Sequence, residues 1–369
     1  MKLRIERDRL ADVVAWAART LPTRPTVPVL SGVLLHAEND IVTLTSSDQE
    51  VSSRAEVEAS VGEPGDALVS GRLLADIAKL LPPQPVTLQL EGTRLSVKCG
   101  RASFALPTLP VEDYPPLDTM PPVAGTVHGS VLSDAVGQVA IAASRDDTLP
   151  VLTGVRVEFE SSTITLAATD RYRLAVRSLP WQSASTRDLP AVLVRGRTLS
   201  DLSRPLAHVP DVSVALDDAG TLVGLSGGGR QSTTPLLEGE FPAYRQLLPT
   251  DPGTVVTMNT AELVDSVKRV KLVVERPNTP VKVTFSDGEA ILSAGSGDDP
   301  SANETAEATI DGEGMDIAFN PEYLLDGLGA IGSERVRIAL KQSTRPAVFS
   351  ADDDTADYQY LLMPVRLAG

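Results

Sequence analysis

The stretch TVPVLSGVLLH at residues 26–36 returns as TLPVLTGVRVEF at residues 148–159, 122 positions further along the chain. In both places a Pro-Val-Leu segment is followed by Ser or Thr, a glycine and an alternating apolar run. This pattern predicts a tight turn that leads into a β-strand. Because the interval has the length of an ordinary domain, the two stretches predict tandem copies of one domain.

Other segments recur in the same order around this pair. LADVV (10–14) returns as LSDAV (132–136), TSSDQEVSSRA (45–55) as AATDRYRLAVR (167–177), and GRLLADI (71–77) as GRTLSDL (196–202). A weaker third copy contributes LVDSV (263–267), PVKVTF (280–285) and NPEYLLDGL (320–328). A chain of 369 residues fits three domains. We expect them at 1–122, 123–250 and 251–369.

Each copy has two halves, and each half is a helix followed by strands. In the first expected helix, Leu10, Val13, Val14 and Ala17 share one face. The second expected helix has an apolar face made of Leu73, Leu74, Ile77, Leu80 and Leu81. The six helices are expected at 7–20, 72–81, 128–145, 197–207, 261–272 and 320–331. Helices isolated among alternating strands indicate an α+β class, with helices on one side of the sheets.

Composition limits the possible functions. Cys99 is the only cysteine, which argues against a disulfide framework or a cysteine metal site. The first residues, MKLRIERDRL, are charged, and no apolar run reaches the ~18 residues of a membrane span. We therefore expect a cytoplasmic protein without a membrane association. The net charge of −16 argues against tight binding of nucleic acid by the surface as a whole.

The negative charge lies almost entirely outside the expected helices. These helices carry 11 of the 33 Lys and Arg residues and 9 of the 49 Asp and Glu residues, which leaves 22 and 40 for the rest of the chain. Solvated helix faces are one explanation. The same segregation in three copies favours another, namely a weakly basic lining that surrounds a polyanion without gripping it.

Sequence signals for catalysis are weak. GLSGG (224–228) matches the nucleophile elbow of serine hydrolases, but GRQSTTPL follows where a helix is needed, and His208 is the last histidine. A hairpin turn is favoured, and a serine esterase built on Ser226 is the distant alternative. No Walker A loop is present, and the three histidines lie far apart. We predict a protein that is not an enzyme, with no metal and no cofactor.

Four segments together resemble the bacterial DNA polymerase III beta subunit, the sliding clamp. They are LPVLTGV (149–155), ATDRYRLA (168–175), EGEFPAYRQLLP (238–249) and LLMPVRL (361–367). The resemblance covers essentially the whole chain in the family's order. It implies three tandem copies of the DNA-clamp (processivity-fold) domain, with helices lining the inside and antiparallel sheets outside. One chain would then form half of a closed ring.

The resemblance also implies partners. Two chains would close head to tail around double-stranded DNA, without regard to its sequence. The ring would tether the DNA polymerase III alpha subunit, the clamp loader, and other polymerases and repair proteins. Cations facing DNA would be Arg24, Arg72, Lys79, Arg145, Arg197, Arg204 and Lys268. The dimer contact would use Phe104, Leu106, Leu272, Val273 and Glu304.

Partners would bind through short linear peptides of the Gln-Leu-x-Leu-Phe kind, in an apolar groove carried over from the family residue by residue. The expected pocket residues are Leu152, Thr169, Arg171, Tyr172, Arg173, Leu174, Pro242, Leu247, Asn320, Tyr323, Met363, Pro364, Val365 and Arg366. A methionine-containing wall suits hydrophobic peptide anchors. Plain core docking of an apolar C-terminus explains Leu361 and Leu362 well, but it explains the proline and arginine beside the methionine less well.

The chain departs from the family pattern at three places around this groove. Arg171 and Tyr172 stand where many relatives have Gly-His, residues 149–151 (Leu-Pro-Val) replace an arginine-and-tyrosine stretch, and Asn278 replaces an aromatic residue. These departures bear on partner preference. A further alternative is a specialised second-copy clamp that binds partners without serving bulk replication.

Overall fold

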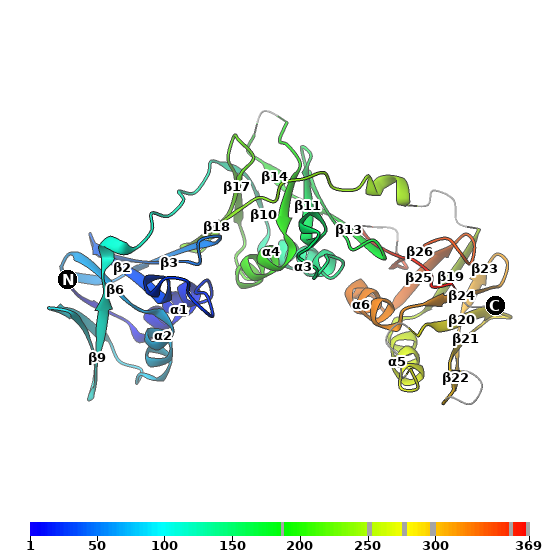
Figure 1. The fold of residues 1–369 in the computed structure, drawn as a ribbon, viewed down its shortest axis with the longest axis horizontal. Helices are drawn as coiled ribbons and strands as arrows, with labels where there is room; N and C mark the ends of the chain where they lie inside the picture. The colour runs from blue at the N-terminus through cyan, green and yellow to red at the C-terminus, as the bar shows by residue number, and fades with distance from the viewer. Residues whose placement is uncertain (186–187, 249–252, 275–278, 296–299, 354–356, 367–369) are drawn as a thin grey trace. The chain divides into compact units, whose positions relative to one another are not determined.

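The computed structural model describes residues 1–185, 188–248, 253–274, 279–295, 300–353 and 357–366. Its elements recur in one order, and each of three passes contributes nine strands and two helices among the described residues (Figure 1). The fold class is α+β with antiparallel sheets, as predicted.

The first pass contains β1 (Lys2–Ile5), α1 (Arg7–Ala18), β2 (Gly32–Glu38), β3 (Ile41–Ser47), β4 (Ser52–Glu58), β5 (Ser60–Glu63), β6 (Gly65–Ser70), α2 (Gly71–Leu80), β7 (Val86–Glu91), β8 (Arg94–Cys99) and β9 (Ala102–Leu109). The second contains β10 (Val123–Val127), α3 (Gly129–Ala140), β11 (Gly154–Phe159), β12 (Thr163–Thr169), β13 (Arg173–Pro180), β14 (Gln182–Ser183), β15 (Val192–Arg195), α4 (Gly196–Ser203), β16 (Val212–Leu216), β17 (Leu222–Gly227) and β18 (Arg230–Pro235).

The third pass contains β19 (Thr254–Asn259), α5 (Thr260–Lys271), β20 (Val281–Ser286), β21 (Glu289–Ala294), β22 (Ala302–Glu307), β23 (Thr309–Asp311), β24 (Met315–Phe319), α6 (Pro321–Ile331), β25 (Arg335–Leu340), β26 (Ala347–Ala351) and β27 (Tyr358–Leu362). Five short 3₁₀ helices supplement them: η1 (Pro28–Ser31), η2 (Val111–Asp113), η3 (Pro150–Thr153), η4 (Arg204–Leu206) and η5 (Tyr244–Leu247).

The repeated turn-into-strand has the same structure in both copies. A 3₁₀ helix begins at a proline and ends at Ser31 or Thr153, whose hydroxyl donates to the carbonyl of that proline at 2.7 Å in each case. The next residue, Gly32 or Gly154, starts the strand with nearly identical backbone angles. A Cβ there would lie 2.6 Å from a leucine of the neighbouring strand, which explains the glycine in both copies.

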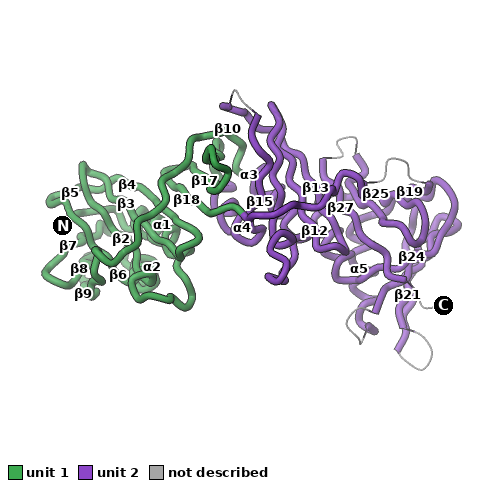
Figure 2. The backbone as a smooth tube through the Cα atoms, turned by 45° about the horizontal axis from the view of Figure 1, so that its top comes forward, with its two compact units in different colours: residues 1–129, 208–236 green, residues 130–207, 237–369 purple. Residues whose placement is uncertain are grey.

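The chain forms two compact units (Figure 2). The first comprises residues 1–129 and 208–236. Its strands run in the hydrogen-bonded order β10-β16-β17-β18-β4-β3-β2-β6-β9-β8-β7-β1-β5. Helices α1 and α2 pack against each other in this unit, and α1 also contacts β3 and β4. The face of α1 that the sequence predicted is buried, since Leu10, Val13, Val14 and Ala17 all lie in the core.

The second unit comprises residues 130–207 and 237–369. One of its sheets has the order β15-β11-β12-β13-β27-β26-β25-β19-β23, and the other has the order β22-β21-β20-β24. Helices α5 and α6 pack together, and α5 also contacts β21 and β22.

One kind of strand pairing occurs in both units. β4 pairs with β18 in the first unit, from Ser52 opposite Thr233 to Ala55 opposite Arg230. In the second unit, β13 pairs with β27, for example Leu174 opposite Leu361. β4 and β13 each close a three-stranded meander, and β18 and β27 are each the last strand of their pass. Each pairing therefore joins one pass to the end of the next.

Two further strands, β22 and β9, hold the equivalent positions but do not pair with each other. β22 closes the third meander and pairs with β21 alone among described strands. β9 ends the first pass and pairs with β8 along its length, but with β6 only at Thr108 and Leu109. Both strands therefore offer a free edge within the described part of the chain.

Two details of the sequence prediction were wrong. The third helix ends at Ala140 and does not reach Arg145, because the amide of Ser144 donates to the carbonyl of Leu152 at 2.7 Å and draws the chain away. Of the apolar face expected on the second helix, Leu74, Ile77 and the C-cap residue Leu81 are buried, but Leu73 and Leu80 are exposed. These two leucines are seven residues apart and share a different face of the helix.

The predicted hairpin at GLSGG is confirmed. Ser226 lies on β17 opposite Gln231 of β18, and Gly228 and Gly229 form the turn with positive φ. A strand follows where a hydrolase elbow needs a helix, so the structure does not support an esterase built on Ser226.

Candidate functional site

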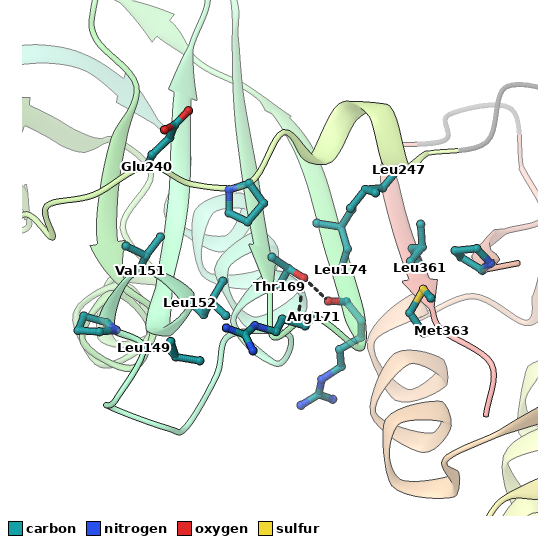
Figure 3. Close-up of a pocket in the computed structure, with 14 residues that line it drawn as sticks. Leu149, Val151, Leu152, Thr169, Arg171, Leu174, Glu240, Leu247, Leu361 and Met363 are labelled. Atoms are coloured by element: carbon teal, nitrogen blue, oxygen red, sulfur yellow. Dashed lines mark hydrogen bonds between the residues drawn. The ribbon is translucent and has the colours of Figure 1, made fainter. Parts of the chain in front are cut away.

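A cavity of about 450 Å³ opens in the second unit beside the β13–β27 pairing (Figure 3). It is lined by Leu149, Pro150, Val151, Leu152, Thr169, Arg171, Arg173, Leu174, Glu240, Pro242, Leu247, Pro346, Leu361 and Met363. Apolar side chains dominate this lining, and a few polar groups lie among them. Cavities of this composition bind ligands with hydrophobic anchors.

The cavity has a buried floor and a partly exposed rim. Leu174 and Leu361 are almost fully buried and face each other across β13 and β27, where they join a core cluster with Phe241 and Tyr244. Leu247 and Met363 form the rim, with 51% and 39% of their surfaces exposed. An apolar ligand would therefore remove water mainly from the two rim side chains.

The turn between β12 and β13 positions the polar side of the cavity. The amide of Arg171 donates to Thr169 Oγ1 at 3.2 Å, and the amides of Tyr172 and Arg173 donate to Asp170 Oδ1 at 3.0 and 3.1 Å. This turn holds Arg171 in the left-handed region with φ of 80°. It therefore places the Arg171 side chain on the cavity lining (Figure 3).

The first copy contains the same turn, at Ser47 to Val51. The amide of Gln49 donates to Ser47 Oγ, those of Glu50 and Val51 donate to Asp48 Oδ1, and Gln49 has φ of 82°. Gln49 is thus the counterpart of Arg171. The backbone geometry of the turn is the same in both copies, but the side chain at this position differs.

Arg173 lines the cavity and also fixes the wall to which it belongs. Its Nε donates to Asp170 Oδ2 at 2.9 Å, its Nη1 donates to Asp326 Oδ2 of α6 at 2.6 Å, and its guanidinium lies 4.4 Å from the centre of the Tyr323 ring. Burial opposes its charge, but Tyr360, Asp326 and Asp170 together raise the pKa of Arg173. It is a permanent cation that ties the β12–β13 turn to α6.

A carboxylate on β11 holds the segment that carries the opposite rim. Glu158 accepts hydrogen bonds from Arg156 Nε at 2.7 Å, Tyr244 Oη at 2.9 Å and Arg245 Nη2 at 2.5 Å. Burial alone would raise the pKa of Glu158, but these donors outweigh it and hold the pKa below its usual 4.5. Because Tyr244 and Arg245 belong to η5, Glu158 fixes the position of Leu247.

The structure brings together eight of the fourteen side chains expected at the pocket: Leu152, Thr169, Arg171, Arg173, Leu174, Pro242, Leu247 and Met363. The other six do not line the cavity. Tyr172 is exposed and stacks on Tyr323 with ring centres 6.2 Å apart. Asn320 caps α6 by accepting from the amides of Glu322 and Tyr323.

The remaining three belong to the tail, where Pro364 is half-buried, the Val365 amide donates to the Ala318 carbonyl, and Arg366 is exposed. Asn278 lies outside the described residues. The lining also includes residues that the expected set lacked: Leu149, Pro150, Val151, Glu240, Pro346 and Leu361. Five of them lie inside the quoted sequence segments, so position in those segments was a usable signal. Pro346 had none.

The other expected residues lie on the surface, with one exception. The cations expected to face DNA are all exposed: Arg24, Arg72, Lys79, Arg145, Arg197, Arg204 and Lys268. Of the residues expected at the dimer contact, Leu272 and Phe104 are 84% and 41% exposed, and Val273 is half-buried. Glu304 on β22 accepts hydrogen bonds from the Arg269 guanidinium at 2.7 to 2.9 Å. Leu106 is 2% exposed, so its side chain belongs to its own core.

No helix in the described ranges is long and apolar enough to cross a membrane. Within the same ranges, no group of three or more His, Cys, Asp and Glu side chains is arranged to hold a metal ion.

Comparison with known proteins points to one family. Residues 1–118 match the N-terminal domain of the DNA polymerase III beta subunit, residues 126–243 its central domain, and residues 245–366 its C-terminal domain. The chain is 52% identical to the beta sliding clamp of Streptomyces coelicolor and 45% identical to the beta sliding clamp homolog GriR of Streptomyces muensis. These alignments cover 100% and 99% of both proteins.

Solved structures agree. The Bacillus subtilis DNA polymerase sliding clamp superimposes with a TM-score of 0.92 at 27% identity, and covers 100% of both chains. A Pseudomonas aeruginosa sliding clamp bound to griselimycin superimposes with a TM-score of 0.93 at 31% identity, again over 100% of both chains.

Proposed function

The chain belongs to the DNA polymerase III beta subunit family, the bacterial beta sliding clamps, and from this we propose that it is a replicative processivity factor. Two chains would form a head-to-tail ring that encircles duplex DNA and slides along it. Polymerases and other replication and repair proteins would be tethered through the cavity of the second unit. The three copies would be separate domains at 1–122, 123–250 and 251–369.

The observation that carries the ring proposal is the unused third strand pairing. β4–β18 and β13–β27 each join one pass to the end of the next, and β22 and β9 are the equivalent strands that remain. The end strands β9, β18 and β27 begin at residues 102, 230 and 358, evenly spaced at 128 residues. A second copy could supply β9 to β22, and the reciprocal contact would close a two-chain ring. This closure would also cover both free edges.

The exposed charges suit encirclement of DNA. Five of the seven proposed DNA-facing cations lie on α2, α4, α5 or η4, and the chain as a whole carries −16. A few phosphate contacts carry no sequence information and permit sliding. The acidic remainder would oppose adhesion of the outer surface to DNA.

The cavity supports the tethering role. Its buried floor, its exposed Leu247 and Met363 and its fixed polar turn suit a short peptide with apolar anchors. Burial of one Leu or Phe contributes about 1.5–3 kcal/mol. Ordering of the peptide offsets much of this, so micromolar affinity is expected.

Sliding needs no reaction by the clamp itself, so the proposed protein is not an enzyme. It would be opened by a clamp loader that hydrolyses ATP, and it would act in the cytoplasm, where the chromosome is replicated. A specialised second-copy clamp would share this fold and cavity. Replacement of the housekeeping clamp gene by this one distinguishes the two, since a second-copy protein would not sustain growth.

Retention on DNA tests the encirclement. The protein is loaded onto nicked circular plasmid by a bacterial clamp loader with ATP, and the complex is then moved to salt that abolishes direct binding. Loaded protein is expected to stay on the circle and to run off within minutes once the plasmid is linearised. Retention on linear DNA would show gripping by side chains and contradict the ring.

A further inference from the structure

The cavity lining contains a cation that the fold does not use. Arg171 lies on this lining, and no hydrogen bond or ion pair joins its guanidinium to any residue in the described part of the chain. Arg173, two residues away, is fully committed to Asp170 and Asp326. Among the described residues that line the cavity, Arg171 is thus the one whose positive charge remains available to a ligand.

Asp146, a carboxylate whose pKa Arg171 affects, is already engaged. Asp146 Oδ1 accepts from the amide and the hydroxyl of Thr148 at 3.0 and 2.7 Å. These bonds, and after them the charge of Arg171, lower the pKa of Asp146. The charge of Arg171 therefore affects the pKa of Asp146, but no hydrogen bond or ion pair joins the two side chains among the described contacts.

The backbone at Arg171 does not require an arginine. Its φ of 80° lies in the left-handed region, where glycine is least strained. The counterpart turn of the first copy has the same hydrogen bonds and the same φ with Gln49. Comparison of the two copies within one chain separates the needs of the turn from the identity of its side chain. The turn does not require arginine, so a guanidinium on the cavity lining without a bond to the described residues points to a ligand.

We infer that Arg171 makes this cavity select peptides that carry a carboxylate side chain beside their apolar anchors. This inference rests on the proposed function of the cavity as a peptide site. Glu240, the one carboxylate among the described lining residues, belongs to the linker that also carries Pro242, and Figure 3 shows it apart from Arg171. The two charges give the cavity a polarity. The acidic residue of the peptide lies toward the β12–β13 turn, and its uncharged end lies toward the linker.

The partner class follows from this chemistry. An apolar floor with one available guanidinium favours an acidic amphipathic segment over a neutral or basic one. The contact lies at the cavity mouth, where water and salt screen it. The selectivity is therefore expected to be about three- to tenfold and to fall with ionic strength.

Matched peptide pairs test the inference. Capped peptides with a Gln-Leu-x-Leu-Phe core carry Asp or the isosteric Asn at x, or immediately before or after the core. Their affinities are measured by calorimetry at low and high salt. The proteins are wild type, Arg171→Gln, which installs the residue of the first-copy turn, and Lys2→Gln, which removes a surface cation from the first unit. Thermal unfolding of each variant confirms that the turn is retained.

In wild type and Lys2→Gln, at least one Asp peptide is expected to bind three- to tenfold more tightly than its Asn partner, about 0.7–1.4 kcal/mol. In Arg171→Gln the ratio is expected to fall to about one, while the Asn peptides bind as they do to wild type. Equal binding of every pair to wild type, or a preference that survives Arg171→Gln, would overturn the inference and leave the peptide site standing. Failure of all peptides to bind wild type would overturn both.

Discussion

Arg173 shows how a single residue links the candidate site to the rest of the second unit. It donates to Asp170 in its own turn and to Asp326 on α6, 153 positions away, and it covers the Tyr323 ring. The resemblance to sliding clamps identified Arg173 as a pocket residue. Its partner on α6 could not be predicted, because no local pattern connects residues so far apart in sequence.

Removal of this cation is expected to destabilise the protein. Arg173→Met leaves the largely buried Asp170 side chain without its cation, and loss of one member of a buried ion pair costs about 3–5 kcal/mol. We expect the lower end, because the Asp326 side chain is half exposed. Urea unfolding followed by circular dichroism measures the change. The exposed Arg345→Met variant should stay within about 0.5 kcal/mol of wild type, and an equal effect of the two substitutions would contradict the assigned role.

Glu158 predicts that the stability of the protein depends on pH. Its pKa is lower in the folded protein than its usual 4.5, so the folded state binds this proton less readily than the unfolded state does. The stabilisation is therefore fully present above pH 4.5 and is lost as pH falls through the folded pKa. Unfolding free energies at pH 7 and at successively lower pH should show this loss in wild type. In Glu158→Gln that component should be absent, and an identical pH profile in both proteins would refute it.

At the scale of elements, the sequence predicted the order and type of the elements well and the ends of the helices less well. The apolar periodicity of α1 and the repeated turn at Pro28 and Pro150 follow from local patterns, and the structure confirms both. The end of α3 was wrong because a distant carbonyl, that of Leu152, captures the Ser144 amide. Which strands join one pass to the next could not be read from the sequence, since pairing between passes depends on tertiary register.

Equivalent elements should respond equally to equivalent substitutions. A Cβ on Gly32 or Gly154 would lie 2.6 Å from Leu68 Cδ1 or Leu193 Cδ1. Overpacking of this kind costs about 1–3 kcal/mol, so Gly32→Ala and Gly154→Ala should both lower the unfolding free energy by that amount. Gly137→Ala in α3 is the control, because nothing lies within 4 Å of its Cβ. It should be neutral or stabilising by up to ~1 kcal/mol. Opposite responses of Gly32 and Gly154 would argue against structural equivalence.

At the scale of the whole molecule, two free strand edges remain to be explained. β22 and β9 are the third instance of a pairing that the chain makes twice within itself. Phe104 belongs to β9, and Leu272 caps α5, the helix that contacts β22. Both apolar side chains are exposed in one chain and would be covered in a ring. Burial of both side chains at each of the two contacts between chains predicts a stable dimer that forms without DNA.

Sedimentation decides whether these edges close the ring. The native protein is expected to have a mass of about 78 kDa at micromolar concentration, twice the 39.0 kDa of one chain. Leu272→Asp and Phe104→Asp place a charge in a contact that excludes water, so each should yield monomers. Both positions are exposed in the single chain, so each variant should keep its circular dichroism spectrum and peptide affinity. Ile41→Asp alters a residue as exposed as Phe104 but away from β9, and should remain dimeric. A dimer that survives both interface substitutions would show that other surfaces join the chains. The likeness of β9 and β22 to the paired strands β4–β18 and β13–β27 would then reflect the repeats within one chain and not a contact between two chains.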